Sequence, residues 1–135
     1  MKLSRTVAYA LQATLQLAQA PPGTPVPCSR LAAEGKMPER FLLQVLRNLV
    51  AHGILESTRG VDGGYRLERD PGQISLLEVI EAIDGPLSAM LPANEGLPAE
   101  SRSKLERALD EVTTTARREL DSVKLADLMQ QVDAS

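Results

Sequence analysis

Polar side chains that could read the bases of a double helix are spaced along residues 39–48. Arginine can grip O6 and N7 of guanine, glutamine can bond N6 and N7 of adenine, glutamate can accept from cytosine, and leucine can touch the thymine methyl. We expect Arg40 and Gln44 to meet base edges, and Arg47, nearly two turns further on, to meet phosphate. The alternative is a solvated helix face. The outward-facing set is Glu39, Arg40, Leu43, Gln44, Arg47 and Asn48.

Further polar and basic residues could hold a polyanion around that segment. Arg59 precedes Gly60 in a glycine-rich turn, and a guanidinium on such a thin tip can enter a narrow minor groove. The alternative for Arg59 is an ion pair with Glu56 or Asp62. Tyr65 is expected to pack its ring under the hairpin. The candidate phosphate contacts are Lys2, Ser4, Arg5 and Arg30.

One cysteine, Cys28, and one histidine, His52, are present in the 135 residues. They exclude an internal disulfide framework and cannot supply a zinc site or a cysteine-ligated cluster from a single chain. A reducing, cytoplasmic setting is therefore expected. The positive end of a predicted helix and Arg30 could lower the pKa of the Cys28 thiol and make it a redox switch. The alternative is a small apolar side chain tucked under the helices.

Charge is divided unevenly along the chain. Overall, 15 Lys+Arg oppose 18 Asp+Glu, a net charge of -3. Up to Gly72 there are nine basic and six acidic residues, a balance of +3, and from Gln73 onward six basic and twelve acidic, a balance of -6. The basic half suits a polyanionic partner. Three aromatic residues are too few for a platform that stacks single-stranded bases.

Several other classes of protein are excluded by what the sequence lacks. No run of eighteen apolar residues is present, so no membrane span is expected. Polar residues interrupt the first twenty positions too often for a secretion signal. No nucleophile elbow or phosphate loop accompanies His52, so the chain is not expected to be an enzyme.

Three predicted helices would position the candidate side chains. An amphipathic helix over residues 4–19 is capped by Ser4, and its apolar stripe is Leu3, Val7, Ala8, Leu11, Leu15 and Ala18. A short helix over 29–34 should end at Gly35 in a left-handed conformation. Pro38 opens a third helix that ends at Gly53. Its predicted buried face is Phe41, Leu42, Val45, Leu46, Leu49 and Val50.

The spacing of these helices predicts a helix-turn-helix, with a plain helical hairpin as the alternative. Two strand-like segments, 54–59 and 65–69, follow the third helix and flank Gly60-Val61-Asp62-Gly63-Gly64. Consecutive glycines between short strands are typical of a hairpin tip that needs positive φ angles. A hairpin directly after the third helix is a wing, which in winged helix-turn-helix proteins crosses the DNA backbone or enters a minor groove.

The second half of the chain begins with a helix and ends with a longer one. Ser75 and Glu78 form a capping box for a helix whose stripe is Leu76, Val79, Ile80 and Ile83. Residues 86–98 are rich in proline and glycine and predict a loop. A long helix follows over 99–121, and its narrow seam, typical of pairing with a second copy, is Leu105, Leu109, Val112, Ala116, Leu120 and Val123. The alternative is that this helix folds back on its own domain.

Several motifs in order resemble one family of regulators. They are Met1-Lys2-Leu3-Ser4 with Tyr9-Ala10, Phe41-Leu42-Leu43-Gln44-Val45-Leu46, Leu55-Glu56-Ser57-Thr58-Arg59-Gly60, Gly63-Gly64-Tyr65-Arg66-Leu67, Ile74-Ser75-Leu76, and Val79-Ile80-Glu81-Ala82-Ile83-Asp84-Gly85-Pro86. Over residues 1–86 the chain is similar to the iron-sulfur-cluster-regulator family, which includes the IscR, NsrR and CymR types. The resemblance implies a dimeric winged-helix repressor that binds partly palindromic promoter DNA. It places recognition on residues 38–47, including Pro38, minor-groove contact on Arg59, and dimerisation on the long helix.

The chain departs from the cluster-carrying members of that family. Aligned without gaps, their three cysteines fall on Pro92, Pro98 and Lys104, and Arg107 stands where one type has a histidine ligand. Proline, lysine and arginine are not soft ligands, so neither a cluster nor another cofactor is expected. The chain therefore resembles a cluster-free branch, and its signal is left open.

Together these features predict a mostly α fold with a small β-hairpin wing: a winged helix-turn-helix with a long C-terminal dimerisation helix. The predicted division is a DNA-binding domain over 1–86, a loop over 87–98, and a dimerisation helix with a C-terminal segment over 99–135. The expected partners are double-stranded promoter DNA, a second copy of the chain and an unknown small-molecule or protein effector, with no membrane. The alternative function is a winged-helix module that docks on a metabolic enzyme or another regulator.

Overall fold

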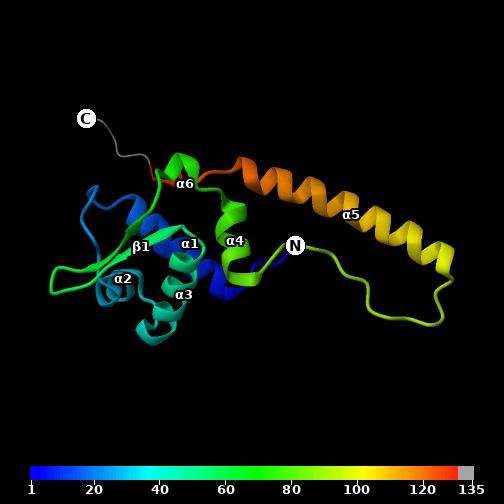
Figure 1. Ribbon diagram of the computed structural model, residues 1–135, viewed down its shortest axis with the longest axis horizontal. Helices are drawn as coiled ribbons and strands as arrows, with labels where there is room; N and C mark the ends of the chain where they lie inside the picture. The colour runs from blue at the N-terminus through cyan, green and yellow to red at the C-terminus, as the bar shows by residue number, and fades with distance from the viewer. Residues whose placement is uncertain (131–135) are drawn as a thin grey trace.

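The computed structural model describes residues 1–130, so the last five residues of the predicted C-terminal segment, 131–135, lie outside the described residues. Its elements are α1 (Arg5–Ala18), α2 (Cys28–Gly35), α3 (Glu39–Ala51), β1 (Leu55–Thr58), β2 (Gly64–Leu67), the 3-10 turn η1 (Pro71–Gln73), α4 (Leu76–Asp84), α5 (Ala99–Ser122) and α6 (Leu125–Leu128). Figure 1 shows α1 to α4 gathered with the hairpin, while α5 extends away from them. Within residues 1–130, no helix is both long and apolar enough to cross a membrane.

The predicted start of the first helix is confirmed, but part of its stripe is wrong. The Ser4 hydroxyl accepts from the backbone N–H of Val7 at 3.2 Å and so caps α1. Leu3 lies before the helix and is 42% exposed, and Ala8 is exposed. The buried residues of α1 are Val7, Ala10, Ala13, Thr14 and Leu17. Because α1 contacts α2, α3, α4, β2 and α6, its small residues face inward and let these neighbours approach closely.

The turn between α2 and α3 differs from the prediction at one residue. Gly35 is the last residue of α2, and it is Lys36 that takes the left-handed conformation, with a φ of 54°. A Cβ on Gly35 would lie 2.6 Å from Gln12 Nε2 and 2.7 Å from the Met37 methyl group, which are the ends of flexible side chains that can shift. The same Gln12 amide donates to the Gly35 carbonyl at 2.6 Å. This close approach packs α2 against α1 and sets the position of the helix-turn-helix.

The predicted hairpin is confirmed, and a third segment of the chain forms backbone hydrogen bonds with its second strand. Strands β1 and β2 pair antiparallel, with Leu55 opposite Leu67 and Thr58 opposite Gly64. Val26, in the loop after α1, bridges Tyr65 through two backbone bonds of 2.9 Å. A Cβ on Gly64 would collide with the Val26 carbonyl group, so glycine permits this approach. The base of the wing is therefore attached to the loop that follows α1.

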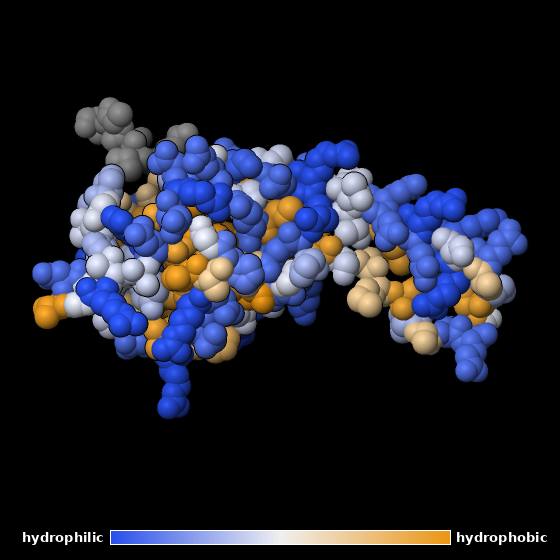
Figure 2. Space-filling view, in the orientation of Figure 1, coloured by the Kyte–Doolittle hydropathy of each residue, from blue (hydrophilic) through white to orange (hydrophobic). Residues whose placement is uncertain are grey.

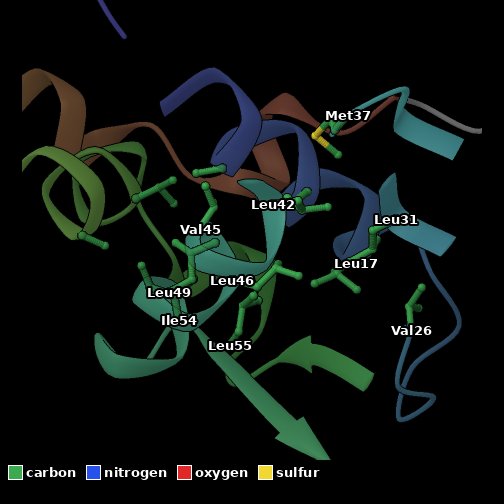
Figure 3. Packing of buried hydrophobic residues seen from close by; sticks show 14 of the residues in the cluster. Leu17, Val26, Leu31, Met37, Leu42, Val45, Leu46, Leu49, Ile54 and Leu55 are labelled. Carbon is green, nitrogen blue, oxygen red and sulfur yellow. The ribbon is translucent and has the colours of Figure 1, made fainter. Parts of the chain in front are cut away.

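The hydrophobic core lies between α1, α3, α4 and the base of the hairpin. Figure 3 shows Leu42, Val45, Leu46 and Leu49 of α3 packed with Ile54 and Leu55, and all six are buried. The prediction that Phe41 is buried is wrong. Its side chain is 45% exposed and contacts Tyr9 edge to face, with ring centroids 5.8 Å apart. Val50 is only half-buried. The core face of α3 is therefore narrower than its apolar residues suggest.

The Ser75–Glu78 capping box at the start of α4 is confirmed in both directions. The buried residues of this helix are Leu77, Val79, Ile80 and Ala82, whereas Leu76 and Ile83 of the predicted stripe are half-buried. The stripe is displaced because α4 packs against α1 and α3 on one side and against α5 on another.

The chain leaves this body after α4 and returns to it beside the start of α4. The backbone N–H of Leu76 donates to the Val123 carbonyl at 2.8 Å, and that of Leu125 donates to Ile74 at 2.9 Å. Leu125 is fully buried in the core. We call residues 1–86 with 123–128 the body, and residues 87–122, the loop with α5, the arm.

Candidate nucleic-acid interface

The outer face of α3 carries three long polar side chains in a line. Arg40, Gln44 and Arg47 are exposed and lie opposite the buried face of the helix. Leu43 and Asn48, on the flanks, are half-buried, and Glu39 is exposed in the first turn. Pro38, the N-cap residue, precedes the helix and is exposed. The face can therefore present two guanidinium groups and an amide to a groove.

The Gln44 side chain is held by its neighbour one turn further along α3. Gln44 Nε2 donates to Asn48 Oδ1 at 3.2 Å. The carbonyl oxygen of the Gln44 amide and its second N–H remain available, which are the groups that a bidentate contact with adenine uses.

The wing presents Arg59 without a carboxylate partner in the described part of the chain. Glu56, one predicted partner, pairs instead with Arg66 at 3.0 Å, and no ion pair joins Arg59 to Asp62 within residues 1–130. Gly60, with a φ of 113°, begins a turn closed by a 3.0 Å bond from the Gly63 N–H to the Gly60 carbonyl. Arg59 is exposed at the base of this tip.

A cleft of about 370 Å³ separates the second half of α3 from the wing. Two arginines and three hydroxyl-bearing residues line it, and no acidic side chain does. The lining residues are Arg47, Val50, Ser57, Thr58, Arg59, Gly64 and Tyr65. Tyr65 is half-buried against the core, as predicted for a ring under the wing. A cleft of this charge can accept a phosphate backbone between helix and wing.

The four predicted phosphate contacts differ in whether their side chains already have partners within the protein. Lys2 and Arg5 are exposed and form no ion pair within residues 1–130, and the Tyr9–Phe41 contact brings their end of α1 next to the start of α3. Ser4 uses its hydroxyl to cap α1 and also donates to Asp84 at 3.4 Å. Arg30 on α2 pairs with Glu34 at 2.9 Å, which reduces the charge that it offers.

Cys28 does not have the predicted reactive environment. Burial raises the pKa of the thiol, and the nearby Glu39 carboxylate raises it further. Its Sγ donates to the Glu39 carbonyl at 3.8 Å, and the side chain packs against the core. The predicted lowering of the pKa is therefore wrong, because burial and the nearby Glu39 carboxylate both disfavour the thiolate, while Arg30 pairs with Glu34. The geometry favours a small apolar side chain.

The arm does not fit the ligand set of an iron–sulfur cluster. Pro98 precedes α5 as its N-cap residue, Lys104 pairs with Glu100 at 3.4 Å, and Arg107 is exposed. Pro92 contributes only its carbonyl, which accepts from Arg102 at 3.2 Å. The single cysteine of the sequence lies on α2, in the body. Neither a thiolate nor an imidazole is available along the arm to bind iron.

The predicted seam lies along α5, with one exception. None of the 24 residues of α5 is buried. Leu105 is 40% and Val112 64% exposed, while Leu109, Ala116 and Leu120 are half-buried. Val123 is a correction, because it follows the helix as its C-cap residue and bonds to the start of α4. Figure 2 shows apolar patches among the polar surface of the arm.

Comparison with known proteins agrees with this geometry. The chain matches the family model Rrf2, described as an iron-dependent transcriptional regulator, over residues 3–131. A putative HTH-type transcriptional regulator of Mycobacterium tuberculosis is 41% identical over 90 residues, 67% of this chain but only 56% of that protein. The match therefore spans little more than half of that relative.

Solved structures extend the similarity to the arm. The structure of CymR, the global cysteine regulator of Bacillus subtilis, superposes with a TM-score of 0.77 at 27% identity, covering 98% of this chain and 99% of that one. IscR of T. potens gives a TM-score of 0.71 at 28% identity, covering 98% and 94%. These neighbours confirm the winged-helix fold with its long C-terminal helix. The chain belongs to the Rrf2 family of transcriptional regulators, with the DNA-binding fold of that family.

Proposed function

We propose that the chain is a homodimeric repressor that binds double-stranded promoter DNA in a sequence-specific way and works without an iron–sulfur cluster. The line of Arg40, Gln44 and Arg47 on α3, beside a wing that presents Arg59, carries this proposal. In this arrangement α3 enters a major groove by its first turns and the wing reaches the adjacent minor groove.

The individual contacts follow from the groups that each side chain offers. Arg40 and Gln44, in the first half of α3, read base edges, with Pro38, Glu39 and Leu43 around them. Arg47 lines the cleft next to the wing and binds a backbone phosphate there, while Arg59 and Gly60 occupy the minor groove. Lys2, Ser4, Arg5 and Arg30 flank this surface as phosphate contacts.

Pairing with a second copy is supported by the exposed arm. Although α5 contacts α4, where Arg117 pairs with Glu81, none of its 24 residues is buried, and its apolar residues recur at the spacing of a coiled-coil seam. We infer that the seam of two arms contains Leu105, Leu109, Val112, Ala116 and Leu120. Two recognition helices related by a two-fold axis would then meet major grooves about 34 Å apart, or a multiple of that distance.

Repression is the simplest outcome of such binding, because a dimer that covers a promoter excludes the polymerase by occupancy alone. The signal that releases it is a small molecule or a protein, since the arm offers iron no soft ligand. In this proposal residues 1–86 bind DNA, residues 87–98 are a connecting loop, and α5 serves dimerisation, while residues 123–128 return to the body.

A salt titration of binding tests the proposal. The full chain is mixed with a labelled duplex from its own upstream promoter region and, separately, with random duplex, while fluorescence anisotropy is recorded. A specific repressor with about six phosphate contacts loses affinity steeply as salt rises yet keeps a preference of roughly 1,000-fold or more for its site. Equal binding to both duplexes, or none, would contradict the proposal and favour a protein-docking module.

A further inference from the structure

The tip of the wing carries an acidic side chain as well as the arginine. Gly60 to Gly63 form one four-residue turn, in which Val61 is fully exposed and Asp62 is exposed. Within residues 1–130, Asp62 has no hydrogen-bond or ion-pair partner, and Arg66, the arginine of the second strand, pairs with Glu56. Figure 1 places the wing tip at the end of the long axis opposite the far end of α5.

The turn that carries Asp62 is rigidly built. A Cβ on Gly63 would collide with the Thr58 carbonyl oxygen, so the chain doubles back tightly behind the tip. The Val26–Tyr65 bridge anchors the strand that leaves the turn. The tip therefore carries Arg59 and Asp62 on one short, well-supported loop, and neither charge neutralises the other through an ion pair.

A carboxylate at this position opposes contact with phosphate but suits one base edge. Phosphates and the A·T minor groove present acceptors only, so Asp62 finds no donor there. The exocyclic N2 amino group of guanine is the donor that a G·C pair adds to the minor groove. Arg59, by contrast, donates to the acceptors that every pair presents in that groove. The two side chains therefore need different partners: Asp62 needs a donor, and Arg59 needs an acceptor.

We propose that Asp62 is a specificity-determining residue that accepts a hydrogen bond from guanine N2 in the minor groove under the wing. The inference rests on the proposed DNA-binding function and adds a base preference to it: the operator carries a G·C pair at the wing tip. Asp62 thereby opposes the preference for narrow A·T tracts that Arg59 alone would give.

A competing explanation gives Asp62 a role only in the protein. Aspartate is common in β-turns, where it stabilises the chain reversal. In that case its charge would weaken binding to every sequence equally by repelling phosphate. The two explanations predict different responses to removal of one amino group from the DNA. Affinity falls if Asp62 bonds to guanine, and it does not fall if Asp62 acts only within the protein.

The experiment uses inosine, which differs from guanine only by lacking the N2 amino group and leaves the major-groove edge unchanged. The operator is first selected from a random duplex pool with the full chain, and guanine at the wing step is then replaced by inosine. We expect about a tenfold loss of affinity for the unmodified protein, the size of one hydrogen bond to a charged group, and a loss of less than twofold for Asp62→Asn and Asp62→Ala.

A matched variant controls for charge. Glu68→Gln removes one exposed carboxylate from the far end of the hairpin, and it should respond to inosine as the unmodified protein does. Binding of the unmodified protein that is unchanged or tightened by inosine overturns the inference, since a narrower groove would favour Arg59 alone. An A·T pair selected at the wing step also overturns it. Selection of no sequence at all would overturn the proposed function itself.

Discussion

The body and the arm are stabilised in different ways. In the body, side chains such as Leu42, Leu46 and Leu49 are completely buried, and helices pack on several sides of one another. In the arm, α5 has no buried residue and relies on helical ion pairs such as Arg102–Glu106 at 3.0 Å. Such pairs contribute only about 0.2–0.5 kcal/mol each. The candidate nucleic-acid interface thus rests on a well-packed core, whereas the arm is the part for which we propose a partner.

The largest expected effect falls on the arm. The double substitution Leu109→Asn with Val112→Asn removes four apolar side chains from a dimer, at about 1.5–3 kcal/mol for each one that pairing buries. We expect monomers in sedimentation velocity at micromolar concentration. The seam is wrong if the dimer survives.

A matched change outside the seam controls for the presence of asparagine on α5. Thr114→Asn lies on α5 between Val112 and Ala116, and its side chain is exposed. It should leave the dimer intact. Circular dichroism of both variants should show the body still folded, because no residue of the arm belongs to the buried core.

A substitution in the body should have a smaller effect that does not depend on protein concentration. Leu46 is 0% exposed at the centre of α3. Leu46→Ala should lower the free energy of unfolding by about 2–5 kcal/mol, since it leaves a cavity in a packed core. Urea unfolding at two protein concentrations distinguishes the regions: the loss stays constant for Leu46→Ala, whereas for the arm variant it shrinks on dilution, because dilution also removes the stabilisation that pairing gives the unmodified protein.

Loss of one DNA contact should be milder again. Arg59→Ala is expected to weaken binding to the selected operator by about 1–3 kcal/mol, measured by anisotropy, with no change in unfolding. If random duplex loses affinity equally, Arg59 is a phosphate contact. Arg69→Ala is not a suitable control, because Arg69 pairs with Glu78 at 3.0 Å and supports the fold.

The smallest expected effect concerns the cap of α4. Partial burial raises the pKa of Glu78, but hydrogen bonds from the Ser75 N–H and from Arg69 outweigh it, so the pKa is lowered overall. The stabilisation is therefore present above the ordinary glutamate pKa of about 4.3 and is lost as pH falls through the lowered value. Glu78→Gln should cost about 0.5–1 kcal/mol at pH 7.

Unfolding curves at two pH values check this prediction. The difference between the unmodified protein and Glu78→Gln should be full above the ordinary glutamate pKa and should shrink as the pH falls through the lowered pKa of Glu78, where the carboxyl becomes protonated. A constant difference would show that the side-chain charge does not contribute. Because the residue lies in the body, neither protein should change its association state over this range.

Local signals in the sequence predicted the body well. The Ser4 cap, the Ser75–Glu78 box and the glycines of the wing tip each act through bonds within a few residues, so the pattern alone reveals them. The predictions that depended on which side faces the core were less accurate. Phe41 is 45% exposed although its ring contacts Tyr9, and Lys36 rather than Gly35 takes the left-handed conformation.

The sequence pattern does not predict contacts between distant segments, because these contacts depend on how the elements pack. The Val26 bridge to the wing and the burial of Leu125 link residues that are 39 and 51 positions from their partners Tyr65 and Ile74. The Cys28 pKa likewise depends on Glu39, which only the folded α2–α3 turn brings near. The candidate surface on α3 was accessible to sequence reasoning because its side chains share one helical face.

The chain enters and leaves the arm at neighbouring points of the body. Residues 87–122 therefore form an insertion in the topology of the body. The bonds Leu76–Val123 and Ile74–Leu125 join the segments on either side of it, and the arm meets the body chiefly along α4, where Arg117 pairs with Glu81. Arms of other lengths or sequences could therefore be exchanged at this point while the DNA-reading surface is preserved. Partner choice and signal can then diverge between related regulators more rapidly than the operator that each one reads.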